Sequence, residues 1–174
     1  MKWKCKSCGE EHDELPICFG FHPPWSMFVE PDEFEDRVAL TEDTCIIDDD
    51  QFFIRGNIKI PILKHDELFE YSVWSSLSAE DYAHATQRWD EPDRHKDPPY
   101  AGQLMTPIAG YPDTLKLKLK IQTQPCGFVP LITLEKSQHP LALEQLNGIS
   151  IARWHEIAEF MLHPPAKKKR KSTR

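Results

Sequence analysis

The stretch TLKLKLKI, residues 114–121, alternates apolar and polar side chains along most of its length. In an extended chain its leucines and isoleucine share one face, and its three lysines lie on the other. This period of two predicts a strand that packs against a core on one side and meets water on the other. Such strands are typical of antiparallel sheets, because parallel sheets are buried on both faces. The stretch therefore limits the chain to folds with a half-exposed, largely antiparallel sheet.

Other segments extend this sheet and add helices. TCIIDDDQFFIRGNIKIPI predicts strands on both sides of a turn at three aspartates, LFEYSVWSSL continues as strand, and GFVPLITLE is expected beside TLKLKLKIQ. Helical spacing and capping residues, such as Ser78 three residues before Asp81, indicate helices. We expect them near residues 32–40, 79–89, 140–147 and 150–162. Strands grouped before terminal helices give a single α+β domain with flanking helices.

Three segments follow from composition. Residues 1–22 form a cysteine-rich segment that resembles a zinc knuckle, residues 23–163 the α+β body, and residues 164–174 a basic tail expected to be disordered. Six of the 21 Lys and Arg residues lie in the last eight positions, which leaves 15 basic residues against 28 acidic ones, a formal charge of −13. Such a body repels phosphate backbones and suits a basic protein partner, and only the tail offers a weak contact to nucleic acid.

Two absences bear on location. No apolar run approaches the roughly 18 residues that a membrane span requires. The start MKWKCKSCGEEHDE also lacks the apolar stretch of a secretory signal. We therefore expect a cytoplasmic protein without a membrane contact. In that reducing compartment the five cysteines argue for metal binding rather than for a disulfide framework.

The first two cysteines have the spacing of a metal site. Cys5 and Cys8, followed by a glycine, allow one turn of the chain to present two thiolates to a zinc ion. We expect His12 to be a third ligand and either Cys18 or Cys45 to be the fourth. A closed site of four ligands would be structural, since it leaves no position for substrate. The alternatives are a pair of free cysteines or a redox pair, but a thioredoxin-like motif belongs in a βαβ unit and this one precedes the core.

No complete catalytic signature occurs in the chain. The segment His155-Glu156-x-x-Glu159 lacks the second histidine of a zinc protease and is better explained as an amphipathic helix. The aspartates in IDDD lack the glycine and closing glutamate of a calcium loop.

Nearly the whole body resembles a bacterial family of unknown function, domain of unknown function 2199. The resemblance rests on CKSCGEEHDELP, DTCIIDDDQFFIRGNIKIPI, VWSSLS, PPYAGQL, YPDTLKLK and HPLALEQLNGIS followed by EIAEFMLH. It implies a cytoplasmic bacterial protein but no activity. Cys45 matches a cysteine of the family pattern and Cys18 matches none. The chain has AGQL and QPCGFVP where the family tends to read F-G-W-L and R-P-V-G-x-R-P, and the missing arginines weaken any shared anion pocket.

Three functions remain open at this stage. The first is a zinc-stabilised, partner-binding protein of a regulatory or immunity type. The second is an enzyme whose pocket is assembled from dispersed residues such as Arg55, Trp74, Tyr100 and His139. The third is a nucleic-acid-associated protein that acts through the tail.

Overall fold

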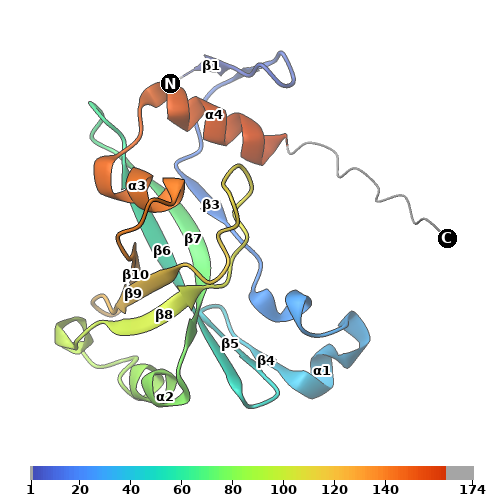
Figure 1. The fold of residues 1–174 in the computed structure, drawn as a ribbon, viewed down its shortest axis with the longest axis vertical. Helices are drawn as coiled ribbons and strands as arrows, with labels where there is room; N and C mark the ends of the chain where they lie inside the picture. The colour runs from blue at the N-terminus through green and yellow to red at the C-terminus, as the bar shows by residue number, and fades with distance from the viewer. Residues whose placement is uncertain (1, 164–174) are drawn as a thin grey trace.

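The computed structural model describes residues 2–163, which fold into one α+β domain (Figure 1). The tail predicted at 164–174 lies outside the described residues. A small hairpin contains β1 (Trp3–Lys4) and β2 (Glu11–His12). The main sheet has the strand order β3-β7-β8-β9-β10-β6-β5-β4. Its strands are β3 (Cys18–Gly20), β4 (Val38–Leu40), β5 (Thr44–Ile47), β6 (Gln51–Pro61), β7 (Leu68–Leu77), β8 (Tyr100–Leu104), β9 (Lys118–Gln122) and β10 (Leu131–Leu134).

Five of these strands close into a small barrel. β6 pairs with β7 as well as with β10, so the series β6, β7, β8, β9 and β10 returns to its starting strand. The β10–β6 and β3–β7 pairs are parallel, and the other pairs in the sheet are antiparallel. The predicted α+β class with a largely antiparallel sheet is confirmed. The closure of the barrel by a parallel pair is not predicted from the sequence, because the alternation within one strand does not indicate which strand it pairs with.

The alternation that predicted β9 is borne out over part of its length. Leu119 and Ile121 are buried in the barrel core, while Lys118 and Lys120 are exposed. The strand begins only at Lys118, because Lys116 adopts a left-handed backbone with φ of 62° and its N–H donates to Leu104 O across 2.7 Å. That kink turns the preceding residues out of the ladder.

The helices agree with the sequence except at the first. α2 (Ala79–Gln87), α3 (Pro140–Asn147) and α4 (Ile151–Leu162) lie where they are expected, and Ser78 caps α2 by accepting from Asp81 N. Short 3-10 turns occupy η1 (Pro24–Met27), η2 (Pro31–Glu33) and η3 (Arg94–Lys96). In the part of the chain that the structure describes, no helix is long and apolar enough to cross a membrane.

The helix predicted at 32–40 is wrong in its second half. α1 spans only Phe34–Arg37, and Val38–Leu40 form the edge strand β4 beside β5. Arg37 decides the change: its carbonyl accepts from Asp48 N, and its guanidinium forms two hydrogen bonds with the Asp48 carboxylate at the β5–β6 turn. This tertiary contact fixes the chain at the helix end and overrides local helical spacing.

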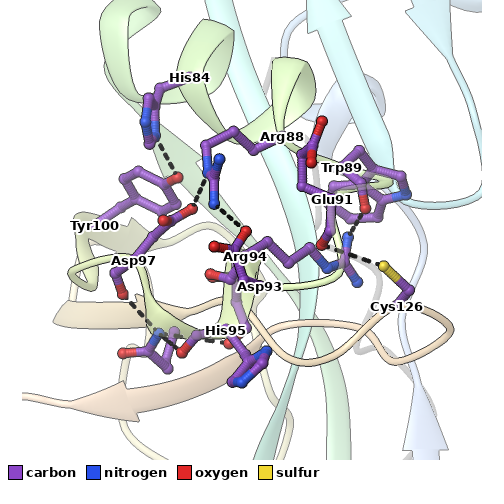
Figure 2. Close-up of polar contacts among 12 residues, drawn as sticks. His84, Arg88, Trp89, Glu91, Asp93, Arg94, His95, Asp97, Tyr100 and Cys126 are labelled. Atoms are coloured by element: carbon purple, nitrogen blue, oxygen red, sulfur yellow. Dashed lines mark hydrogen bonds and ion pairs between the residues drawn. The ribbon is translucent and has the colours of Figure 1, made fainter.

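A buried arginine joins two loops beside the barrel (Figure 2). Arg94 is 2% exposed, and its guanidinium donates to the backbone carbonyls of Trp89, Gln124 and Phe128 at 2.6–2.8 Å. The guanidinium also lies 4.5 Å from the centre of the Trp89 ring. Thr123 completes the contact by donating its hydroxyl to the Arg94 carbonyl at 2.6 Å. The guanidinium of Arg94 therefore connects the loop before β8 to the loop after β9 through its hydrogen bonds.

Candidate metal centre

The N-terminal hairpin shapes a tight turn around the first two cysteines. β1 and β2 pair with Trp3 opposite His12, so the loop between them carries Cys5 and Cys8. Cys5 N donates to Glu10 O, and Gly9 N donates to Cys5 O, each across 2.9 Å. Gly9 takes φ of 78°, a left-handed conformation that glycine adopts without a steric penalty. The turn brings both thiols to the same side of the hairpin as His12.

The hairpin packs on α4 through aromatic and polar contacts. Trp3 is 3% exposed, stacks on His12 with ring centres 4.9 Å apart, and meets the His155 ring edge-on at 5.4 Å. Lys6 N donates to a carboxylate oxygen of Glu159 at 2.7 Å. Further along the chain, Trp154 Nε1 donates to Pro16 O at 2.8 Å. These contacts place the hairpin against the helix near the far end of the sequence.

The helix residues that face the hairpin follow a spacing of four. His155, Glu159 and His163 therefore lie on one side of the helix axis, one turn apart. His163 is the C-terminal cap of α4, and its N–H donates to Glu159 O at 3.0 Å. The predicted interpretation of this segment as an amphipathic helix holds, but its polar side meets a neighbour rather than water.

Four potential metal ligands converge at this contact. One ligand atom from each of Cys5, Cys8, His12 and His163 lies within 4.8 Å of the other three. Cys8 Sγ and His12 Nε2 are 3.4 Å apart. Zinc bonds of ~2.3 Å to sulfur and ~2.0 Å to nitrogen place tetrahedral ligand atoms roughly 3.3–3.8 Å apart. The observed group needs only a small contraction to reach that geometry.

An unsatisfied nitrogen supports the fit of a metal ion. His163 Nε2 is buried and has no hydrogen-bond partner within residues 2–163. Buried polar atoms almost always have a partner, so an isolated one indicates a missing ligand or water. A cation between the two thiols and His12 would provide that partner. The group has the residue types and the geometry to hold a metal ion.

The backbone favours a charged sulfur at Cys5, whereas at Cys8 a hydrogen bond from the Glu10 N–H is outweighed by burial and the neighbouring Cys5 thiol, which raise the pKa. Burial raises the pKa of the Cys5 thiol, but hydrogen bonds from the N–H groups of Cys8 and Ser7 outweigh it and leave the pKa below its usual value. Thiolate is the form that binds metal. These backbone N–H groups donate hydrogen bonds to the sulfur and so stabilise its negative charge.

The two cysteines proposed for the fourth position lie elsewhere. Cys18 is exposed on β3 opposite Glu70, and burial together with that carboxylate raises its pKa. Cys45 is fully buried on β5 among Ile47, Phe53 and Trp74, where burial raises its pKa to about 11. A thiol that stays protonated in an apolar cluster is a packing residue. Neither belongs to the converging group.

His163 occupies the position that the sequence left to a cysteine. The available signal is the placement of a histidine at the end of the last helix, on the same side as His155 and Glu159. This spacing indicates that one side of the helix is in contact with another segment, but it does not indicate which segment.

The residues suggested for a dispersed enzyme pocket have separate local partners. Arg55 pairs with Asp43, Tyr100 bonds His84, and the side chain of His139 caps α3 by accepting from Leu141 N. The Trp74 indole donates to Phe21 O. Across the described residues 2–163, no side-chain hydrogen bond or ion pair joins any two of the four.

Comparison with known families finds one match that covers most of the chain. The model of the family described as "uncharacterized protein conserved in bacteria (DUF2199)" matches residues 4–149. The chain belongs to this family. The DUF2199 match includes Cys5, Cys8 and His12 and ends before α4, so His163 lies beyond it. No curated protein and no solved structure matches the chain.

Proposed function

We propose that Cys5, Cys8, His12 and His163 bind one structural zinc ion, and that this DUF2199 protein acts by binding a protein partner. The observation that carries the proposal is the convergence of four ligand atoms from the two ends of the described chain. Two cysteines and two histidines suit a borderline-soft cation such as zinc. Four protein ligands leave no open coordination position, so the ion would stabilise structure rather than perform chemistry.

The ion would fasten the hairpin to α4. Its ligands are separated by as many as 158 positions in the sequence, from Cys5 to His163. The hairpin itself contains two strands of two residues each, which is too little to be stable alone. Metal binding would therefore contribute to the folding free energy of the whole domain, because the ligand set exists only when α4 is in place.

A concentrated negative charge indicates where a partner would bind. Residues 30–50, here called the acidic lobe, comprise η2, α1, β4, β5 and the turn after β5. They contain ten acidic residues and one basic residue, Arg37, a formal charge of −9. The lobe lies at the opposite end of the long axis from α4 (Figure 1). Most of the charge of the acidic body is therefore on one end of the molecule.

Most acids of the lobe are not used in folding. Seven are exposed and form no ion pair with another described residue: Glu30, Asp32, Glu35, Asp36, Glu42, Asp49 and Asp50. Apolar side chains are exposed beside them, with Phe28 and Leu40 each 40% exposed. Apolar contacts surrounded by charge are typical of protein interfaces, where the charge steers association. The exposed acids and apolar side chains of the lobe therefore favour a basic protein as the partner.

Charge reversal in the lobe is expected to abolish capture of this partner. The full chain is immobilised and exposed to lysate of a bacterium that encodes it, and captured proteins are identified by mass spectrometry. We expect a basic protein that binds wild type and is lost with Glu35→Lys/Glu42→Lys. With the purified partner, the affinity should fall by roughly tenfold or more, because two favourable charges become repulsive.

The matched control is Asp90→Lys/Glu91→Lys, which makes the same change of charge at two exposed acids outside the lobe that form no ion pair with another described residue. This control should capture the partner as wild type does. Equal capture by both double variants would contradict a role for the lobe, and capture of acidic proteins alone would contradict the proposed partner class.

A further inference from the structure

A hollow of about 450 Å³ lies between β10 and α3. Leu134 contributes its floor from the strand, and Ala142 and Leu143 contribute from the helix. Leu146 lines the same hollow and is 63% exposed. The hollow is therefore apolar at its base and open to solvent along one side, and α3 leaves a large aliphatic side chain uncovered there.

Lysines continue the hollow across the outer face of the barrel. Two adjoining hollows of about 350 and 420 Å³ share Leu134 and Lys136 with the first and extend over β9. They add Lys116, Lys118 and Lys120 to the lining. All four lysines are exposed, and none forms an ion pair with another described residue. We call this continuous surface the lysine groove.

The pairing of the strands shows that these charges are not used by the sheet. Lys120 lies between Ala101 on β8 and Thr133 on β10, and Lys118 lies opposite Gln103. A cross-strand carboxylate at any of these positions would add stabilisation. Lys120 has only small or neutral neighbours, and Lys118 forms no ion pair with another described residue although Glu135 follows the β10 register beside it. Only Glu135, whose N–H donates to Lys118 O, brings an acid to the groove.

We propose that the lysine groove binds an extended acidic peptide segment of a partner protein, with one apolar side chain seated against Leu146. Lys118 and Lys120 are two residues apart on one face of a strand, about 6.8 Å along the chain. Carboxylates at alternate positions of an extended peptide repeat at the same distance. The lysines of the groove and the carboxylates of the peptide can therefore pair one to one. The aliphatic side chains at the base of the hollow would contact the apolar side chain of the peptide. This site is independent of the zinc ion and of the acidic lobe.

The chemistry of the groove favours a peptide over nucleic acid. The residues that line the three hollows include no aromatic side chain on which a base could stack. A long phosphate chain would also extend from the groove over a body that carries a formal charge of −13 and would repel it. A short peptide places its charges only where the lysines lie.

Binding is measured by fluorescence anisotropy with the full chain and a fluorescein-labelled ten-residue peptide. The peptide has glutamate at alternate positions, one leucine between two of them, and serine elsewhere. We expect saturable binding that weakens as salt rises. Lys118→Glu/Lys120→Glu should weaken it roughly tenfold or more. Replacing the leucine of the peptide by serine, or Leu146 by Gln, should weaken it severalfold, because the anchor loses its apolar contact.

The matched control is Lys64→Glu/Lys96→Glu, which makes the same change of net charge at two exposed lysines outside the groove. The control should bind within twofold of wild type, and any contact through the basic tail is equal in both double variants. Equal weakening by the two double variants would overturn the proposal. So would tighter, groove-dependent binding of a single-stranded oligonucleotide of equal charge, or loss of peptide binding through self-association of the chain at the groove.

Discussion

Removal of zinc from the purified protein is expected to lower the free energy of unfolding by about 4 kcal/mol when free zinc had exceeded its dissociation constant a thousandfold. The midpoint of thermal unfolding should fall by roughly 8–16 °C for a chain of this size. The physical reason is that the proposed ion would join Cys5 and Cys8 to His163 only in the folded state. Thermal unfolding with and without a strong zinc chelator, followed by circular dichroism, measures the shift.

The matched control for chelation is Cys8→Ser, which removes an exposed ligand without opening the core. Its unfolding midpoint should already be low and should not change on addition of chelator. A wild-type midpoint that is insensitive to chelator after complete removal of metal would contradict a stabilising ion. The circular dichroism of the apo form should keep its strand signal, because the strands of the barrel pair with one another and not with those of the hairpin.

Replacement of Arg94 by methionine is expected to destabilise the fold by about 3 kcal/mol, because buried carbonyl groups lose their donor. Arg94 is 2% exposed, and the hydrogen bonds of its guanidinium all go to backbone carbonyls, including the one of Trp89 drawn in Figure 2. Arg94→Lys should recover only part of the loss, since an ammonium cannot reproduce the planar fork that reaches both loops. Urea unfolding of the three proteins measures the difference.

Arg88→Met is the matched control. Arg88 lies in the same region and pairs with the exposed Asp93 and the partly buried Asp97, so we expect a smaller loss than at Arg94, of about 1–2 kcal/mol. A loss at Arg94 no larger than the loss at Arg88 would show that the clamp between the two loops contributes little.

The parts of the fold that depend on local chemistry could be predicted from the sequence. The alternation around Leu119 places one side of β9 in the core, and the Ser78 cap locates the start of α2. The same holds for the cysteine turn, since only two residues of one loop separate Cys5 from Cys8. In each case the deciding interactions lie within a few residues of one another.

The remaining parts depend on contacts between distant segments. β10 closes the barrel by pairing in parallel with β6 through Leu131 and Asn57. The sequence of neither strand contains a pattern that predicts the other as its partner. The helix expected at 32–40 ends early because Arg37 bonds Asp48, which a local propensity does not include. His163 lies beside Cys5, Cys8 and His12 only because α4 packs on the hairpin.

The most direct test of the account is the zinc content of wild type and of single variants, measured by mass spectrometry after purification without affinity metal and passage over a chelating column. We predict one zinc per chain in wild type, Cys18→Ser and the surface control His22→Ala, and a strong loss in Cys5→Ser and His163→Ala. Zinc retained by His163→Ala but lost from Cys18→Ser or Cys45→Ser would contradict the ligand set, and a metal-free wild type would contradict the site itself.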